Sequence, residues 1–86
     1  MATDRTRDAL RRLRTDRGMS LRQLAAQTHC DHSWLANIEV GRRWPGDRNW
    51  VEQADLALDA DGAIVAAWDG DQREQAVAAE TVRLLD

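Results

Sequence analysis

The sequence predicts an all-α fold, with five short helices followed by an extra C-terminal helix. Ser20 and Gln23 have the spacing of a capping box, which places the start of one helix at Leu21. Asp31 is a residue type that caps helices, and Gly41 is the type that ends them. Similar caps and stops recur along the chain, and the apolar residues between them follow helical spacing.

The first helix is expected over residues 4–17, with Thr3 as its cap and Gly18 as its stop. Its apolar stripe is thin, so this helix should lie on the core by one narrow face. That stripe consists of Ala9, Leu10 and Leu13, while Arg11, Arg12 and Arg17 are expected to face solvent.

Residues 20–43 are expected to form two helices joined by a tight turn. Only residues 27–30 separate the two helices, so they cannot pack antiparallel and should cross steeply. This is the helix-turn-helix arrangement, whose second helix can enter the major groove of DNA. The residues that share an inward face are Leu21, Leu24 and Ala25 in the first helix, and Trp34, Leu35 and Ile38 in the second.

Two further helices, at about residues 49–58 and 62–68, are expected to close a five-helix core. A turn at residues 59–62 should separate them. Their inward faces consist of Trp50, Val51, Ala54, Ala57 and Leu58 in the first helix, and Ile64, Val65 and Trp68 in the second.

Beyond Asp69-Gly70-Asp71, residues 72–86 are expected to form a separate C-terminal helix outside the core. We therefore divide the chain into a domain of residues 1–69 and an extension of residues 70–86. The extension could pack on the domain, pair with a second copy as a homodimer, dock a protein partner, or lead to a missing effector domain. Its apolar stripe consists of Val77, Ala78, Thr81, Val82, Leu84 and Leu85.

The length of 86 residues suits one small domain with a compact core. The single cysteine, Cys30, cannot form an internal disulfide, which fits a reducing compartment. The N-terminus carries charges where a signal peptide needs an apolar run, and no segment approaches membrane-spanning length. We expect a cytoplasmic protein that does not contact a membrane.

The net charge of −3 is unevenly distributed. Residues 1–48 hold ten arginines and six acidic residues, a net charge of +4, whereas residues 49–86 hold two arginines and nine acidic residues, a net charge of −7. This division suggests one face that meets phosphate and a second part held away from it. All twelve basic residues are arginines, whose planar guanidinium groups suit phosphate.

Several motifs agree in register with a known family, namely Leu24-Ala25, Leu35 and Ile38-Glu39-Val40-Gly41-Arg42-Arg43. Over about residues 8–69 the chain resembles the lambda-repressor/Xre-type helix-turn-helix family, and in particular the DNA-binding heads of actinobacterial regulators. Two positions depart from the family pattern. His29 stands where the family has a turn glycine, and Asp31 is acidic at the family's variable first recognition-helix position. Histidine tolerates a left-handed backbone better than most residues other than glycine.

The resemblance implies a recognition helix at about residues 31–40, whose outward residues meet base edges. Those residues are Asp31, His32, Ser33 and Asn37. Asparagine can pair with adenine through two hydrogen bonds, whereas serine and histidine are less selective. The alternative is that these are only solvent-facing polar residues. For Asp31 a helix cap is favoured, because a carboxylate beside phosphates is repelled unless it accepts from a cytosine amine.

The resemblance also places Arg42, Arg43 and Arg48, in the following loop, against the sugar-phosphate backbone. Gln23 can both complete its capping box and donate to a phosphate, and the two roles are compatible. Trp34 either packs inward or donates its indole N–H to a phosphate. Its large apolar area favours inward packing.

Arg14 is placed opposite Glu39 by the resemblance, as an ion pair that ties the first helix to the recognition helix. Residues 29–32 offer several metal-ligand types, but adjacent side chains point in different directions, so we expect no metal or other cofactor. Cys30 should instead be a small buried residue. The sequence offers no catalytic constellation, so an enzyme is not expected.

These observations indicate a sequence-specific, DNA-binding transcriptional regulator whose partner is double-stranded DNA. The alternative is a protein-interaction module on the same fold, which binds another regulator or a toxin through its acidic half and has little DNA affinity. The net negative charge and the acidic Asp31 favour that alternative.

Overall fold

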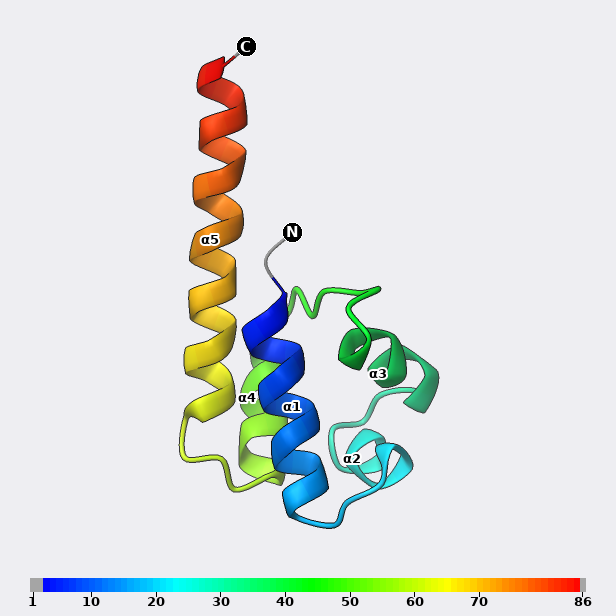
Figure 1. The fold of residues 1–86 in the computed structure, drawn as a ribbon. Helices are drawn as coiled ribbons and strands as arrows, with labels where there is room; N and C mark the ends of the chain where they lie inside the picture. The colour runs from blue at the N-terminus through cyan, green and yellow to red at the C-terminus, as the bar shows by residue number, and fades with distance from the viewer. Residues whose placement is uncertain (1–2, 86) are drawn as a thin grey trace.

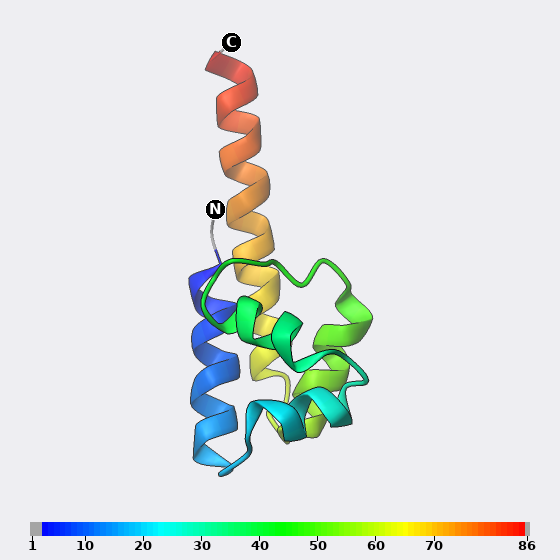
Figure 2. The same ribbon diagram turned by 90° about the vertical axis from the view of Figure 1, so that its right-hand side faces the viewer.

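The computed structural model describes residues 3–85, with side chains described for residues 3–80. Every regular element within residues 3–85 is an α-helix, so the predicted all-α class is confirmed. α1 and α5 run side by side in opposite directions, and α2 and α3 lie together on one side of the molecule (Figures 1 and 2). The elements are α1 (Asp4–Asp16), α2 (Leu21–Gln27), α3 (His32–Glu39), α4 (Arg48–Ala57) and α5 (Ala63–Leu85).

The predicted starts of α2 and α3 are confirmed by side-chain caps. The Ser20 hydroxyl accepts a hydrogen bond from the backbone N–H of Gln23 at 3.1 Å, and Gln23 Oε1 accepts one from the backbone N–H of Ser20 at 2.7 Å. Asp31 Oδ1 accepts a hydrogen bond from the backbone N–H of Ser33 at 2.7 Å. Both caps satisfy N–H groups that have no partner within their helix.

The turn between α2 and α3 and the end of α3 both use a left-handed backbone. His29 has φ of 55° and Gly41 has φ of 82°. His29 therefore takes the conformation that the family gives to glycine. The side chain of Thr28 supports the turn, since its buried hydroxyl donates to the carbonyl of Leu24 at 2.8 Å. Cys30, expected to be buried, is half-buried against the core.

Thr3 is the N-cap residue of α1, as predicted, but its side chain makes no cap hydrogen bond. The cap comes from α5 instead. Asp71 Oδ2 accepts hydrogen bonds from both the backbone N–H and the hydroxyl of Thr6, each at 2.8 Å. A buried carboxylate at this end also compensates the positive end of the α1 dipole.

The predicted separation of a fifth helix at residues 62–68 from a C-terminal helix is wrong, because α5 continues through residues 69–71 to Leu85. The fifth helix and the C-terminal extension are thus one helix of 23 residues, and the boundary that we drew between residues 69 and 70 lies inside it. The hydrogen bonds of Asp71 to α1 hold this stretch in helical register. The upper half of α5 rises beyond the other helices in both views (Figures 1 and 2).

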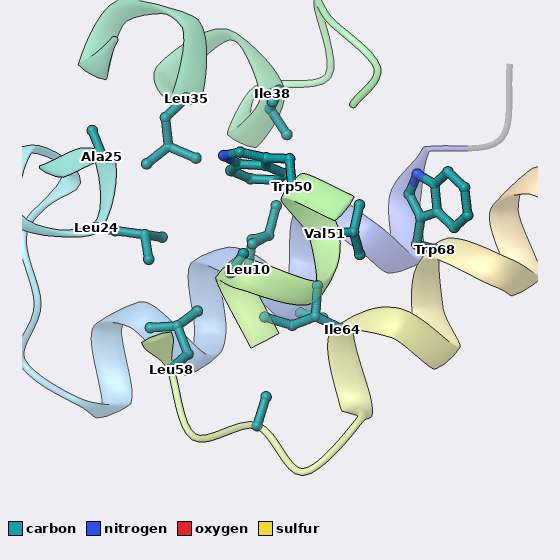
Figure 3. Packing of buried hydrophobic residues seen from close by; sticks show 13 residues of the cluster. Leu10, Leu24, Ala25, Leu35, Ile38, Trp50, Val51, Leu58, Ile64 and Trp68 are labelled. Atoms are coloured by element: carbon teal, nitrogen blue, oxygen red, sulfur yellow. The ribbon is translucent and has the colours of Figure 1, made fainter. Parts of the chain in front are cut away.

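The core lies where all five helices meet, as Figure 3 shows. A second buried carboxylate, Asp55 on α4, organises one of its edges. Asp55 accepts hydrogen bonds from the backbone N–H groups of Gly62 and Ile64, both at 2.9 Å, and so caps the start of α5. The side chains with no more than 1% exposure include Leu10, Leu24, Leu35, Val51, Leu58 and Ile64.

Candidate nucleic-acid interface

The outer surface of α3 is the candidate reading surface. Leu35 and Ile38 on its inner side are buried in the core, which directs the opposite side to solvent (Figure 3). With 3.6 residues per turn, Ser33, Ala36, Asn37 and Val40 then form one outward strip. Ser33 and Val40 are exposed and the other two are half-buried, which agrees with that geometry.

An ion pair between Arg14 and Glu39 fixes α3 against α1. Arg14 Nε and Nη2 donate to the two oxygens of Glu39 at 2.8 and 2.9 Å, and Nη1 donates to the carbonyl of Met19 at 2.9 Å. The Glu39 side chain is only 6% exposed. Its hydrogen bonds raise the pKa of Arg14 above the ordinary value. Two parallel hydrogen bonds of this kind fix orientation as well as distance.

Arg7 on α1 holds the C-terminal end of α3, a role that the sequence did not suggest. Arg7 Nη1 lies 3.5 Å from the carbonyl oxygen of Val40, and Nη2 donates to Asp4 at 2.7 Å. A Cβ atom at Gly41 would lie 2.8 Å from Arg7 Nη1, so any other residue there would push the end of the Arg7 side chain aside. Arg7 and Val40 lie 33 positions apart in the sequence, and no sequence pattern connects them.

The residues predicted to contact bases lie together at the start and along the outside of α3. Asp31, His32 and Ser33 are all exposed around the first turn, and Asn37 follows one turn after Ser33. Asp31 Oδ1 lies 3.8 Å from His32 Nδ1, in addition to its role as the cap of α3. Asp31, His32 and Ser33 therefore lie around the first turn of α3, and Asn37 lies one turn further on, on the same side as Ser33.

Arg42 and Arg43 are fixed to α3 through their backbone. Both N–H groups donate to the carbonyl of Asn37, at 2.8 and 3.2 Å. Both side chains are exposed, and neither guanidinium has a hydrogen bond or ion pair with the part of the chain that the structure describes. The two cations thus lie beside the candidate reading surface with their donors available.

Gln23 is exposed at the start of α2, where its carbonyl oxygen completes the capping box. Its amide NH₂ donates no hydrogen bond within the described residues. The side chain can therefore serve the cap and still donate to an anion at the same end of the helix.

Arg48 and Trp34 have partners inside the protein. Arg48 donates to Asp69 at 2.8 Å and to Glu52 at 3.2 Å, and the hydrogen bond to Asp69 raises the pKa of Arg48. Trp34 packs edge-on against Trp50, with ring centroids 5.0 Å apart. Arg48 therefore joins α4 to α5, and Trp34 covers the core, which is the inward packing that its apolar area favours.

The loop that carries Arg42 and Arg43 is attached to α5 by two tryptophans. The rings of Trp44 and Trp68 are stacked, with centroids 5.9 Å apart and an interplanar angle of 6°. The indole N–H of Trp68 donates to the carbonyl of Pro45 at 2.7 Å. The loop is therefore held at both ends, by α3 at residues 42–43 and by α5 at residues 44–45.

In the described part of the chain, no group of three or more His, Cys, Asp or Glu side chains gathers in a way that could hold a metal ion. Within the same residues, no helix has both the length and the apolar character needed to cross a membrane.

The comparisons with known proteins agree with this geometry. A family model described as a helix-turn-helix domain matches residues 7–68, from α1 into the first turns of α5. No curated protein and no solved structure matches the chain.

Proposed function

Because the chain belongs to the helix-turn-helix domain family, we propose that it is a sequence-specific transcriptional regulator that places α3 in the major groove of DNA. The observation that carries this proposal is the position of Asn37. Its side chain lies on the outward strip of α3, while its backbone carbonyl holds the N–H groups of Arg42 and Arg43. A base-reading side chain and two phosphate-binding side chains are thereby set at a fixed spacing.

In this proposal the contacts divide into two kinds. Arg42, Arg43 and the amide of Gln23 bind phosphates and position the domain, without reading sequence. His32, Ser33 and Asn37 meet base edges, where Asn37 can pair with adenine through two hydrogen bonds. Such a protein would act at the chromosome, in the cytoplasm.

The overall charge of −3 does not oppose this proposal, because several acidic residues of the second half have partners inside the protein. Asp55 and Asp71 are buried as helix caps, and Asp69 neutralises Arg48. Arg42 and Arg43, which are among the arginines with no described partner, lie next to α3. The local field at α3 is therefore more favourable to phosphate than the net charge suggests.

The experiment is a titration of the protein against a random duplex at several salt concentrations, followed by selection of preferred sequences from a random library. We expect affinity for the random duplex to fall steeply as salt rises, because phosphate contacts release counterions. We also expect the selected duplex to bind at least a thousandfold more tightly than the random one. Absence of binding at low salt would contradict the proposal.

The upper half of α5 supports a second role in addition to DNA binding. Most side chains in residues 72–80 are exposed, although they belong to a continuous helix. A helical segment of this length is only marginally stable in water, so a covering partner would stabilise it. That partner could be a second copy in a homodimer, another protein, or an effector domain. The predicted stripe also includes Thr81, Val82, Leu84 and Leu85, whose side chains lie outside the described residues.

The pure interaction module, with little DNA affinity, makes the opposite prediction for the titration. It would bind its protein partner through residues 49–86 and show no salt-dependent affinity for a random duplex. The same experiment therefore decides between the two functions.

A further inference from the structure

The outward strip of α3 contains an apolar row beside its polar row. Ser33 and Asn37 form the polar row, and Ala36 and Val40, also four residues apart, form the apolar row. Val40 is 57% exposed, which makes it one of three large apolar side chains with high exposure in the described residues. Sequence analysis assigned no function to either apolar residue.

The apolar row forms one wall of a recess of about 180 Å³ between α1, α2 and α3. Leu21, the first residue of α2, adds a further apolar side chain to the lining. Its complete lining is Arg11, Arg14, Leu21, Ala36, Glu39 and Val40.

The two charged residues at the inner end of the recess are already satisfied. The Arg14 and Glu39 side chains hydrogen-bond each other, and Arg14 also donates to Met19. They have little capacity left for a polar ligand. The part of the recess bounded by Leu21, Ala36 and Val40 therefore suits a small apolar group, while Arg11 at its edge keeps its donors.

We infer that this recess receives the C5-methyl group of a thymine, so that Ala36 and Val40 read thymine next to the base that Asn37 reads. The methyl is the only apolar group that bases present in the major groove, and alanine is among the side chains that contact it. The inference rests on the proposed placement of α3 in that groove, and it names the base class read there.

Charge favours DNA over a protein side chain as the occupant. Val40 is followed directly by Gly41, Arg42 and Arg43, and Arg11 lies at the recess itself. The partner must therefore present an apolar methyl group close to several negative charges. Thymine in a duplex has this combination, because phosphates border the groove that displays its methyl.

The test replaces each thymine of the selected duplex, one at a time, by deoxyuridine, which removes only the methyl group. At one or two positions we expect affinity to fall about fourfold, the cost of leaving one such group uncovered. The Val40→Ser variant, which removes both methyl groups of this side chain from the wall, should bind the thymine and deoxyuridine duplexes nearly equally. The Leu56→Thr control changes an exposed leucine on α4 and should keep the full fourfold difference.

Thermal unfolding establishes that each variant is folded before its affinity is compared. Equal binding of thymine and deoxyuridine duplexes by the unchanged protein would overturn the inference and leave the proposed function intact. A full difference that persists in Val40→Ser would place the methyl elsewhere and also overturn it. Failure to select any duplex would contradict the proposed function first, and the inference with it.

Discussion

Asp71 on α5 caps the N-terminal end of α1 through Thr6, although 65 residues separate them in sequence. One carboxylate oxygen accepts both the backbone N–H and the hydroxyl of Thr6, and Asp71 is 1% exposed. Arg7, the next residue on α1, contacts the end of α3. One turn of α1 therefore joins α5 to the candidate reading helix.

The Asp71→Ala variant should lose about 1–3 kcal/mol of unfolding free energy, because two buried donors of Thr6 would lose their acceptor. Urea denaturation measures this loss. Glu80→Ala is the control, since Glu80 is exposed farther along α5, and it should change stability by less than about 0.5 kcal/mol. Equal effects of the two substitutions would show that the Asp71 cap contributes nothing specific.

The hydrogen bond of Asp71 also explains why sequence analysis failed at residues 69–71. Glycine between two aspartates is a typical turn composition, and local reasoning has no access to a partner near the N-terminus. By contrast, the starts of α2 and α3 were predicted correctly because their caps lie within three residues of the groups that they bind. Local caps can be read from sequence, and caps supplied by another helix cannot.

Two glycine substitutions should change stability in opposite directions, because Gly70 lies inside α5 and Gly41 has a left-handed backbone. Gly70→Ala should raise stability by about 0.5–1 kcal/mol, because alanine favours a helix interior and the nearest atom to its Cβ is Arg5 Cδ at 3.4 Å. Gly41→Ala should destabilise, since residue 41 has φ of 82° and a Cβ would lie 2.8 Å from Arg7 Nη1. Thermal unfolding measures both changes. A destabilising Gly70→Ala would contradict a helix that continues through this residue.

The Arg14–Glu39 pair should be much more sensitive to removal of one partner than of both. Glu39→Ala leaves the guanidinium of Arg14 without its carboxylate and should cost about 3–5 kcal/mol. Replacing Arg14 by Met and Glu39 by Leu together leaves no unpaired charge and should cost less. Denaturant titration of the three proteins makes the comparison. If the double replacement costs as much as Glu39→Ala, the pairing is not what stabilises this contact.

Two exposed arginines should separate DNA binding from fold stability. Arg43→Ala removes a cation with no described partner, so it should weaken binding to specific and random duplexes alike and lower the salt slope by about one unit. Arg48→Ala should leave the slope unchanged and lose no more than about 1 kcal/mol of stability, because its guanidinium binds Asp69 and Glu52. A reduced slope for Arg48→Ala would return Arg48 to the phosphate-binding group.

The different positions of Arg43 and Arg48 also mark the limit of sequence reasoning at the interface. Both arginines occur in one basic stretch of the sequence, and the family resemblance assigns them the same role. In the structure Arg43 lies in the loop, whereas Arg48 begins α4. Asp69, which hydrogen-bonds Arg48, lies 21 residues away on α5. The predicted fifth helix ended before Asp69, so the pairing could not be foreseen. The recess beside Ala36 and Val40 escaped prediction for a similar reason, since three separate helices form its lining.

The Asp31→Asn substitution tests the acidic residue at the start of α3. Asparagine caps helices about as well as aspartate, so stability should be preserved while one negative charge is removed from the candidate interface. Affinity for random DNA should then rise about threefold at low salt, and this gain should disappear at high salt, where charges are screened. Asp31→Ala is the matched control, because it removes the same charge but also the hydrogen bond to Ser33, at a cost of about 1 kcal/mol in stability.

If Asp31 accepts a hydrogen bond from a cytosine amine instead, Asp31→Asn will lose affinity only for duplexes with that cytosine. The variants are compared on three duplexes: the selected duplex, the same duplex with each cytosine replaced, and a scrambled duplex. This comparison shows whether Asp31 only caps α3 or also contacts a base.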